Sequence, residues 1–297
     1  MTHTSVLLQE TIAGLDIEPG DIVVDGTLGS AGHTEEIVKR FGNTVRIIGI
    51  DMDEDALTRS KERLKSLNAT ITFVRNNFRN IDQILDDLKI TQVHKILLDV
   101  GLSSDQLETS ERGFSFQKSQ PLLMTFKKEP TEEDITAYTI VNEWQETSIA
   151  DILWGYGEER YSRKIAKAIV EAREFQPINT TTELVEIILS ATPTRYHHQG
   201  IHPATRTFQA LRIAVNDELQ ALQEGLQKGF ERLITGGRMA IISFHSLEDR
   251  IVKRFFQEKA KQGIAHLITK KPITPTEAEI EQNRRSRSAK LRIVRKL

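Results

Sequence analysis

The 297-residue sequence contains no cysteine. This absence excludes disulfide bonds, thiol nucleophiles and thiolate metal sites, so any catalysis has to use oxygen groups, nitrogen groups or a cofactor. Long hydrophobic runs are also lacking. No run approaches the roughly 20 apolar residues that span a bilayer, and the N-terminus lacks the basic and apolar regions of a signal peptide. We therefore expect a cytoplasmic protein with no membrane partner.

Net charge is also low, at −2, but it is unevenly distributed. Residues 284–297 include seven basic side chains and no acidic ones. Such a segment attracts phosphates by releasing counterions, although a solvated tail has the same composition. Arg160, Arg163 and Lys164 form a second basic cluster beside two glutamates. This cluster is either a phosphate-binding surface or an ion-paired helix face.

A glycine-rich segment follows the first buried strand that the sequence predicts. Val23 and Val24 are apolar, and Gly29 and Gly32 come shortly after them, where the backbone has to turn tightly or approach a ligand. Asp51 ends the next predicted strand, 19 positions after Gly32. A carboxylate there can accept hydrogen bonds from both hydroxyls of a ribose. The motif favours an adenosine-type ligand, and both NAD and S-adenosylmethionine fit it. The structural alternative is that the glycines serve only the close packing of the strand and the helix.

Predicted strands and helices alternate through the first hundred residues. Strand, helix and strand are expected within 21–51, helices at 53–67 and 81–88, and further strands at 70–76 and 95–100. This alternation is typical of an α/β fold with a parallel sheet covered by helices. Because parallel strands end at one rim of the sheet, we expect Asp25, Asp51 and Asp99 to line the rim where ligands bind. Asp25 is the residue we expect to fix the glycine turn through backbone N–H groups.

The alternation stops after residue 104. Helices are predicted up to about residue 203, with capping patterns at Thr131, Ser148 and Thr180, and a long helix is predicted from residue 207 to about 233. A strand at 238–244, a helix at 247–261 and strands at 266–270 and 289–294 follow. We therefore predict a sheet domain in two parts, 1–104 and 204–297, with a helical insertion at 105–203. The closing strand pair favours S-adenosylmethionine over NAD, whose enzymes usually repeat the mononucleotide-binding half.

Seven blocks of the sequence match one known family, in order, along nearly the whole chain. They are Gly26–His33, Leu98–Leu107, Glu111–Phe116, Tyr156–Arg160, His202–Arg212, Ile242–Arg250 and Arg287–Arg292. With these blocks the sequence closely resembles the bacterial small-subunit ribosomal RNA cytosine-N4 methyltransferase family.

The resemblance implies a class I S-adenosylmethionine-dependent methyltransferase fold, a Rossmann-like doubly wound sheet with an inserted helical domain. It implies S-adenosylmethionine as the methyl donor and, as substrate, the N4 amine of a decoding-centre cytidine in small-subunit (16S) ribosomal RNA of the 30S particle. It leaves open whether the protein is a monomer or a homodimer. The cofactor contacts that it implies are Ala31, Gly32, His33, Asp51, Phe78, Asp99 and Gln106.

Methylation of an exocyclic cytosine amine sets a chemical requirement, because the lone pair of that nitrogen is delocalised into the ring. The site must hold the amine in line with the methyl group and accept its hydrogen bonds. The candidate catalytic residues are Asp99, Ser103, Ser104 and His245. Capping by the two serines and orientation of a neighbour by His245 are the alternative, structural roles.

Two further features bear on function. The histidines at 197, 198 and 202 are interpreted as a polar loop, not a metal site, because no acidic ligand adjoins them. Residues 119–126 depart from the family, which usually reads aspartate-glycine-proline-leucine-aspartate-methionine-arginine-methionine there, so two carboxylates and one arginine are lost. A non-catalytic ribosome-assembly or RNA-binding factor that retains the fold is therefore the alternative function, and a nicotinamide-dependent oxidoreductase is a second alternative.

Overall fold

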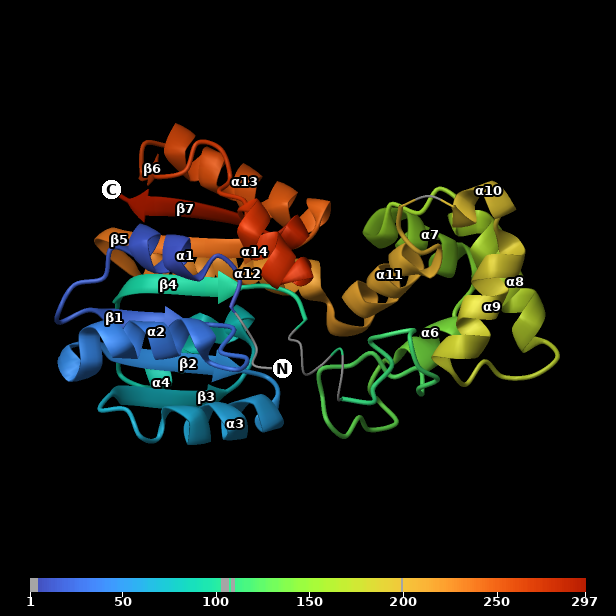
Figure 1. Cartoon of the computed structure of the whole chain (residues 1–297), viewed down its shortest axis with the longest axis horizontal. Coiled ribbons are helices and arrows are strands. Elements are labelled where there is room, and N and C mark those ends of the chain that lie inside the picture. The colour runs from blue at the N-terminus through green and yellow to red at the C-terminus, as the bar shows by residue number, and fades with distance from the viewer. Residues whose placement is uncertain (1–4, 103–106, 108–109, 199) are drawn as a thin grey trace. The chain divides into compact units, whose positions relative to one another are not determined.

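The computed structural model describes residues 5–102, 107, 110–198 and 200–297 (Figure 1). The chain divides into two compact units: a sheet unit, Met1–Gly101 with Leu219–Leu297, and a helical unit, Leu102–Glu218. The sequence analysis predicted that the second part of the sheet domain begins at residue 204. In the structure α11 (Ala204–Asn216) packs against α7 (Glu146–Gly157) within the helical unit, so this second part begins at Leu219.

The sheet unit contains a seven-stranded sheet in the order β3-β2-β1-β4-β5-β7-β6. The pairings that join β1 to β5 into one sheet are parallel, whereas β7 runs antiparallel to both of its neighbours. This confirms the predicted doubly wound sheet with a closing strand pair. The strands are β1 (Ile22–Asp25), β2 (Arg46–Asp51), β3 (Thr70–Arg75), β4 (Val93–Asp99), β5 (Leu233–Ser243), β6 (Ala265–Leu267) and β7 (Lys290–Lys296).

Each face of the sheet has its own hydrophobic core, because successive strand residues point to opposite sides. Val24 and Ile48 pack with α4, α12 and α13, whereas Val23 and Ile47 pack with α1 and α2 (Figure 1). Burial on both faces explains why the central strands read as unbroken apolar runs. The helices of this unit are α1 (Leu8–Leu15), α2 (Gly32–Phe41), η1 (Gly42–Thr44), α3 (Glu54–Leu64), η2 (Phe78–Asn80), α4 (Ile81–Asp87), α12 (Glu218–Arg232), α13 (Ser246–Lys261), α14 (Glu277–Gln282) and η3 (Arg284–Ser288).

The helical unit has a separate core, built from the apolar faces of its helices. Besides α7 and α11, the described part of this unit contains α6 (Ala137–Glu143), α8 (Ser162–Arg173), α9 (Thr181–Ala191) and α10 (Thr194–His197). In the part of the chain that the structure describes, no helix combines the length and the apolar character needed to cross a bilayer.

One of the three predicted helix caps is confirmed. Thr180 accepts a hydrogen bond from the Glu183 N–H (3.3 Å), and the Glu183 carboxylate accepts one from the Thr180 N–H (3.1 Å). Ser148 lies inside α7, which begins two residues earlier, so that prediction was wrong. Thr131 is also not a cap, because its N–H and the Asp134 carboxylate close a turn (2.9 Å), and the next helix starts only after Thr136.

The single long helix predicted from residue 207 to about 233 is wrong. Asp217 adopts a left-handed conformation (φ 50°) and separates α11 from α12. Aspartate tolerates this conformation better than most residues because its short polar side chain can bond locally. A two-point ion pair between Arg212 and Glu218, with both N···O distances at 2.8 Å, spans the break.

The segment that departs from the family, residues 119–126, packs within the helical unit. The Gln120 side chain accepts a hydrogen bond from the Gly113 N–H (3.1 Å), and Pro121 forms a β-bridge with Thr180. The Asn216 side-chain amide donates to the Met124 carbonyl (2.7 Å) and accepts from the N–H of residue 126 (2.9 Å). Of the altered residues, Gln120 holds this segment through its side chain, whereas the bonds at Met124 and Phe126 use backbone groups that do not depend on the residue type.

We expect Gly157→Ala to destabilise the protein. A Cβ at Gly157 would lie 2.6 Å from the backbone oxygen of Arg206 and 3.3 Å from the Cβ of Ala210, so α7 and α11 would have to separate. Overpacking of this kind costs about 1–3 kcal/mol. Urea denaturation measures the effect, with Gly155→Ala in the same helix as the matched control. Nothing lies within 4 Å of a Cβ at Gly155, so that variant should be neutral or stabilised by up to ~1 kcal/mol. Equal stabilities of the two variants would contradict the packing argument.

Candidate active site

The glycine turn between β1 and α2 is tied to the end of the neighbouring strand. The Leu28 N–H donates to the Ile50 carbonyl (2.9 Å), and the Gly29 N–H donates to Oδ2 of Asp51 (2.7 Å). Gly29 has a φ of +52°, a conformation that glycine adopts without strain. At Gly32 a Cβ would lie 1.9 Å from the Ser5 hydroxyl, so the N-terminal segment packs directly on the start of α2. The turn is therefore fixed on both sides before any ligand binds.

Asp51 has both carboxylate oxygens at the rim. Oδ2 accepts the bond from Gly29, and Oδ1 accepts one from the Asp53 N–H (2.8 Å). Burial raises the pKa of Asp51, while these two N–H donors act in the opposite direction. A carboxylate offers about four lone-pair positions, so its two oxygens can still accept further bonds from ribose hydroxyls.

Asp99 lies at the carboxyl end of β4, and one of its oxygens has no hydrogen-bond partner among the residues that the structure describes. This oxygen, Oδ1, is buried, and Oδ2 lies 3.8 Å from Nδ1 of His33. Burial, together with the charges of Asp25 and Glu248, raises the pKa of Asp99 to about 8. A buried polar atom without a partner costs about 1–3 kcal/mol, so this oxygen is a strong candidate for contact with a ligand.

Asp25 fixes the conformation of the glycine turn through hydrogen bonds. It is 2% exposed, and its carboxylate accepts hydrogen bonds from the Thr34 hydroxyl (2.7 Å) and the Thr27 N–H (3.3 Å). Burial raises its pKa to about 6. The Thr27 hydroxyl in turn accepts a bond from the Asp99 N–H (2.6 Å), which links the ends of β1 and β4. The interpretation of Asp25 as a residue that fixes the turn agrees with these contacts.

His245 follows β5 and caps α13, and Glu248 lies beside it. Oε2 of Glu248 accepts bonds from the N–H groups of Phe244 (2.8 Å) and His245 (3.2 Å). Its Oε1 lies 3.0 Å from Nε2 of His245, although the angles do not make a hydrogen bond. Glu248 is 2% exposed. The sequence analysis missed this buried carboxylate. A signal was present, since an acid three residues after a capping position is the capping-box pattern, with histidine in place of serine or threonine.

The other predicted site residues differ in how closely they approach the rim. Ala31 precedes α2 with a φ of +61° and is buried. The His33 ring bonds the Val6 carbonyl (3.1 Å) and so joins the N-terminal segment to the rim. Phe78 packs its ring on α12, where a Cβ at Gly225 would lie 2.5 Å from it. The remaining three, Ser103, Ser104 and Gln106, lie outside the described residues.

One further atom at the turn was not predicted. The Ser30 hydroxyl oxygen is buried and makes no hydrogen bond to any described residue. Because Ser30 directly precedes Ala31, this atom belongs to the glycine turn. No sequence signal distinguishes it, since serine is common in glycine-rich turns.

The histidine-rich loop of the helical unit has contacts of its own. Nε2 of His197 lies 3.0 Å from the Thr192 hydroxyl, and the His202 ring stacks on Phe116 with centroids 4.7 Å apart. Burial lowers the pKa of His202, and the charge of His197 acts in the same direction. These contacts give both rings structural partners within the helical unit.

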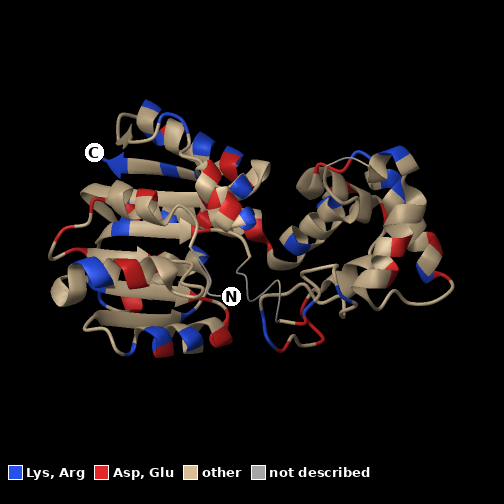
Figure 2. Cartoon of the chain, viewed as in Figure 1, with Lys and Arg blue, Asp and Glu red and all other residues tan. Residues whose placement is uncertain are grey.

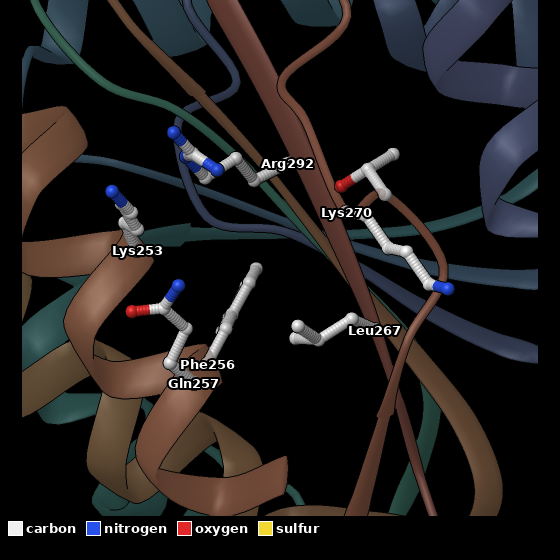
Figure 3. A pocket seen from close by; sticks show the side chains of 7 residues that line it. Lys253, Phe256, Gln257, Leu267, Lys270 and Arg292 are labelled. Atoms are coloured by element: carbon white, nitrogen blue, oxygen red, sulfur yellow. The ribbon is translucent and has the colours of Figure 1, made fainter.

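A small hollow lies elsewhere in the sheet unit, between α13 and the β6–β7 edge. Figure 3 shows Lys253 and Gln257 on the helix, Arg292 on the strand, and Lys270 with its amine pointing away from them. Arg292 is held by Asp249, with Nε–Oδ1 at 2.6 Å and Nη2–Oδ2 at 3.2 Å. The hollow is thus built around a structural ion pair and is separate from the rim formed by β1, β2 and β4.

The rim fits S-adenosylmethionine chemically. This cofactor carries two ribose hydroxyls and an ammonium group, which are donors, and the rim presents the acceptors Asp51 and Asp99. The glycine turn brings backbone close to the same place. Together with the strand order and the antiparallel β7, this site defines a class I S-adenosylmethionine-dependent methyltransferase.

The family match and the similar sequences agree with this class. The MraW methylase family matches residues 1–297. Ribosomal RNA small subunit methyltransferase H of Brevibacillus brevis is 46% identical over 310 residues, covering 99% of this chain and 98% of that protein. The protein of the same name from Clostridium botulinum strain Kyoto is 48% identical, covering 99% of each. A solved rRNA methylase from Streptococcus thermophilus aligns with a TM-score of 0.43 and 12% identity, over 97% of this chain and 93% of that one. The chain belongs to the MraW methylase family.

Proposed function

We propose that this methyltransferase transfers a methyl group from S-adenosylmethionine to the N4 amine of a decoding-centre cytidine in small-subunit (16S) ribosomal RNA. The proposed substrate form is the assembled or nearly assembled 30S particle, which places the enzyme in the cytoplasm. The relatives that match the whole chain carry the name ribosomal RNA small subunit methyltransferase H, which supports the RNA class. The observation that carries the chemistry is Oδ1 of Asp99 at the rim, which is buried and has no hydrogen-bond partner within the described ranges of the chain.

Cofactor binding is assigned to the glycine turn and the rim. Asp51 accepts hydrogen bonds from the ribose hydroxyls, and the backbone of Ala31 and Gly32 approaches the cofactor at the start of α2. Phe78 is proposed as a contact of the adenine, and Asp99 and Gln106 are proposed as contacts of the methionine end. His33 is proposed as a further contact of the cofactor; its Nε2 bonds the Val6 carbonyl (3.1 Å), and its Nδ1 lies 3.8 Å from Oδ2 of Asp99.

The chemistry requires the residues to orient a weak nucleophile. The bound cofactor supplies an electrophilic methyl group on a sulfonium. In its ionised form, which the positive charges of the bound cofactor would favour, Asp99 accepts a hydrogen bond from the N4 amine through Oδ1. This bond orients the nitrogen lone pair and stabilises the positive charge that develops as the nitrogen becomes tetrahedral. Ser103 and Ser104 are proposed as further hydroxyl acceptors for the amine. His245, fixed at the start of α13 beside Glu248, is proposed to approach the same base. The target base has to leave its stack to present the amine.

We expect the purified protein to incorporate tritiated methyl groups into small ribosomal subunits that lack this modification. The measurement is scintillation counting followed by mass spectrometry of the nucleosides, with N4-methylcytidine as the expected product. Protein-free 16S RNA is tested in parallel, and the proposal predicts that the particle is the better substrate.

Three other outcomes have distinct meanings. Methylation at another atom would overturn the N4 assignment, and equal rates on free RNA would overturn the particle as substrate. No incorporation, with S-adenosylhomocysteine still bound in a calorimeter, would favour the non-catalytic assembly factor instead.

A further inference from the structure

The start of α8 in the helical unit is built around a buried carboxylate. Glu159 is 0% exposed, and its Oε1 accepts a hydrogen bond from the Tyr161 N–H (2.8 Å) while Oε2 accepts one from the Tyr196 hydroxyl. Burial and this carboxylate together raise the pKa of Tyr196 to about 12. Glu159 therefore points inward and joins α10 to the start of α8, and it does not neutralise the basic residues outside.

Two tyrosine rings next to this carboxylate form an aromatic surface that we call the tyrosine platform. Tyr161 and Tyr196 pack edge to face with centroids 5.0 Å apart. The guanidinium carbon of Arg160 lies 5.1 Å from the first ring centroid and 4.8 Å from the second, and Arg160 is exposed. Such stacking uses the flat face of a guanidinium, whose N–H edge can donate to an oxyanion. The platform thus orders an arginine that would otherwise be flexible.

Three more cations surround the platform. Arg163 and Lys164 lie in the first turn of α8, Arg195 lies next to Tyr196, and all three are exposed; blue segments mark basic residues around α10 in Figure 2. Across the described ranges, none of the three forms an ion pair with an acidic side chain. By contrast Lys167, the next lysine along α8, lies 3.5 Å from Glu171.

The first turn of α8 carries positive side chains, although the N-terminus of a helix favours negative ones. Helix N-termini are stabilised by acidic groups, yet this turn holds two cations and no acid. An anion bound there would interact favourably with the helix dipole and with both side chains. The arrangement is unfavourable for the isolated helix and favourable for a complex with a polyanion.

We propose that Arg160, Arg163, Lys164 and Arg195, which we call the Arg160 surface, bind backbone phosphates of the ribosomal RNA substrate. This inference rests on the proposed function for the identity of the RNA. Several phosphates are needed to engage cations spread over two helices, which favours a nucleic-acid backbone over a single small anion. The sequence alone left an ion-paired helix face as the alternative, because Glu158 and Glu159 adjoin the cluster. Glu159 is turned inward, and among the described residues Arg163, Lys164 and Arg195 form no ion pair with an acid, which argues against the alternative for these three.

The test is a triple variant, Arg163→Ala, Lys164→Ala and Arg195→Ala, which leaves Arg160, Glu159 and the tyrosine platform intact. Binding to unmodified small subunits is measured by filter binding over a series of KCl concentrations. Three lost phosphate contacts should lower the slope of log K against log salt by about 2–3, and affinity in low salt should fall about 10–100-fold. Affinity for S-adenosylhomocysteine and the melting temperature should not change.

The matched control removes three lysines from the sheet unit: Lys39→Ala, Lys61→Ala and Lys65→Ala. Lys39 and Lys65 are paired with Glu35 (2.7 Å) and Glu62 (3.7 Å), and Lys61 lies 5.7 Å from the ring of Phe73. This control should retain most of the wild-type slope, which separates a local effect from a change in net charge.

An unchanged slope and affinity in the triple variant would overturn the proposal. A loss that appears with subunits and not with protein-free 16S RNA would also overturn it, because the partner would then be a ribosomal protein. If the wild type binds with the expected salt dependence but transfers no methyl group, the proposed function fails while the Arg160 surface stands.

Discussion

Asp51→Ala should bind S-adenosylhomocysteine about 10–150-fold more weakly than the wild type. The carboxylate of Asp51 is the acceptor at the end of β2, and charge-assisted hydrogen bonds from ribose hydroxyls are worth roughly 1.5–3 kcal/mol. Isothermal titration calorimetry measures the affinity directly. Because Gly29 and Asp53 also donate to this carboxylate, part of any loss could come from a looser turn.

A second ligand separates the two causes. The 2′-deoxy analogue of S-adenosylhomocysteine lacks one hydroxyl, so the wild type should bind it more weakly than the parent compound. In Asp51→Ala the two ligands should bind almost equally, because the acceptor is absent. If the analogue is penalised equally in both proteins, the ribose assignment is wrong and the variant acts only through the turn.

Asp99→Asn should lower kcat for methyl transfer about 100-fold or more, the scale expected when a positioned hydrogen-bonding or proton-accepting group is lost. The amide keeps the size of the side chain but removes the charge, and one of its two terminal groups can only donate. Asp87→Asn is the matched control, since Asp87 is an exposed carboxylate at the end of α4. It should have wild-type activity. Wild-type turnover by Asp99→Asn with intact cofactor binding would exclude a catalytic role for Asp99.

The same variant should change how stability depends on pH. In the absence of cofactor the folded protein keeps a proton on Asp99 up to a pKa of about 8, whereas the unfolded chain releases it near 3.8. Wild-type stability contributed by this group is therefore present at low pH and lost as pH rises from about 4 to about 8. Asparagine does not ionise, so the melting temperature of Asp99→Asn should exceed that of the wild type progressively over this range and match it at pH 4. The charged groups around Asp99, namely Asp25, Glu248 and His33, are present in both proteins. A constant difference across the range would show that Asp99 is not the titrating group.

Much of the sheet unit could be predicted because its signals are local. Val23, Ile47 and Leu97 lie in apolar runs of strand length, and Asp25, Asp51 and Asp99 each follow such a run. Parallel pairing then brings the three carboxylates to one rim without further information. The antiparallel β7 could be predicted as one of a pair, although its place between β5 and β6 depends on contacts that the sequence does not display.

The features that could not be predicted depend on packing between residues that lie far apart in the sequence. The break at Asp217 falls inside a continuous helical pattern, so periodicity alone favoured one helix. Glu248 looks like any acid near a helix start until β5 and α13 bury it beside His245. The unpartnered oxygen of Asp99 likewise arises from burial by surrounding elements, and no property of residue 99 alone indicates it.

The division of the chain also sets an order for folding during synthesis. The helical unit is continuous in sequence, so it can form as soon as the ribosome has released residues up to 218. The sheet cannot be completed then, because β4 pairs with β5, and β5 pairs with β7 near the C-terminus. Until those strands emerge, β4 has an open edge that can pair with other chains. Translation of the last 80 or so residues is therefore the period when the nascent chain most needs protection from aggregation.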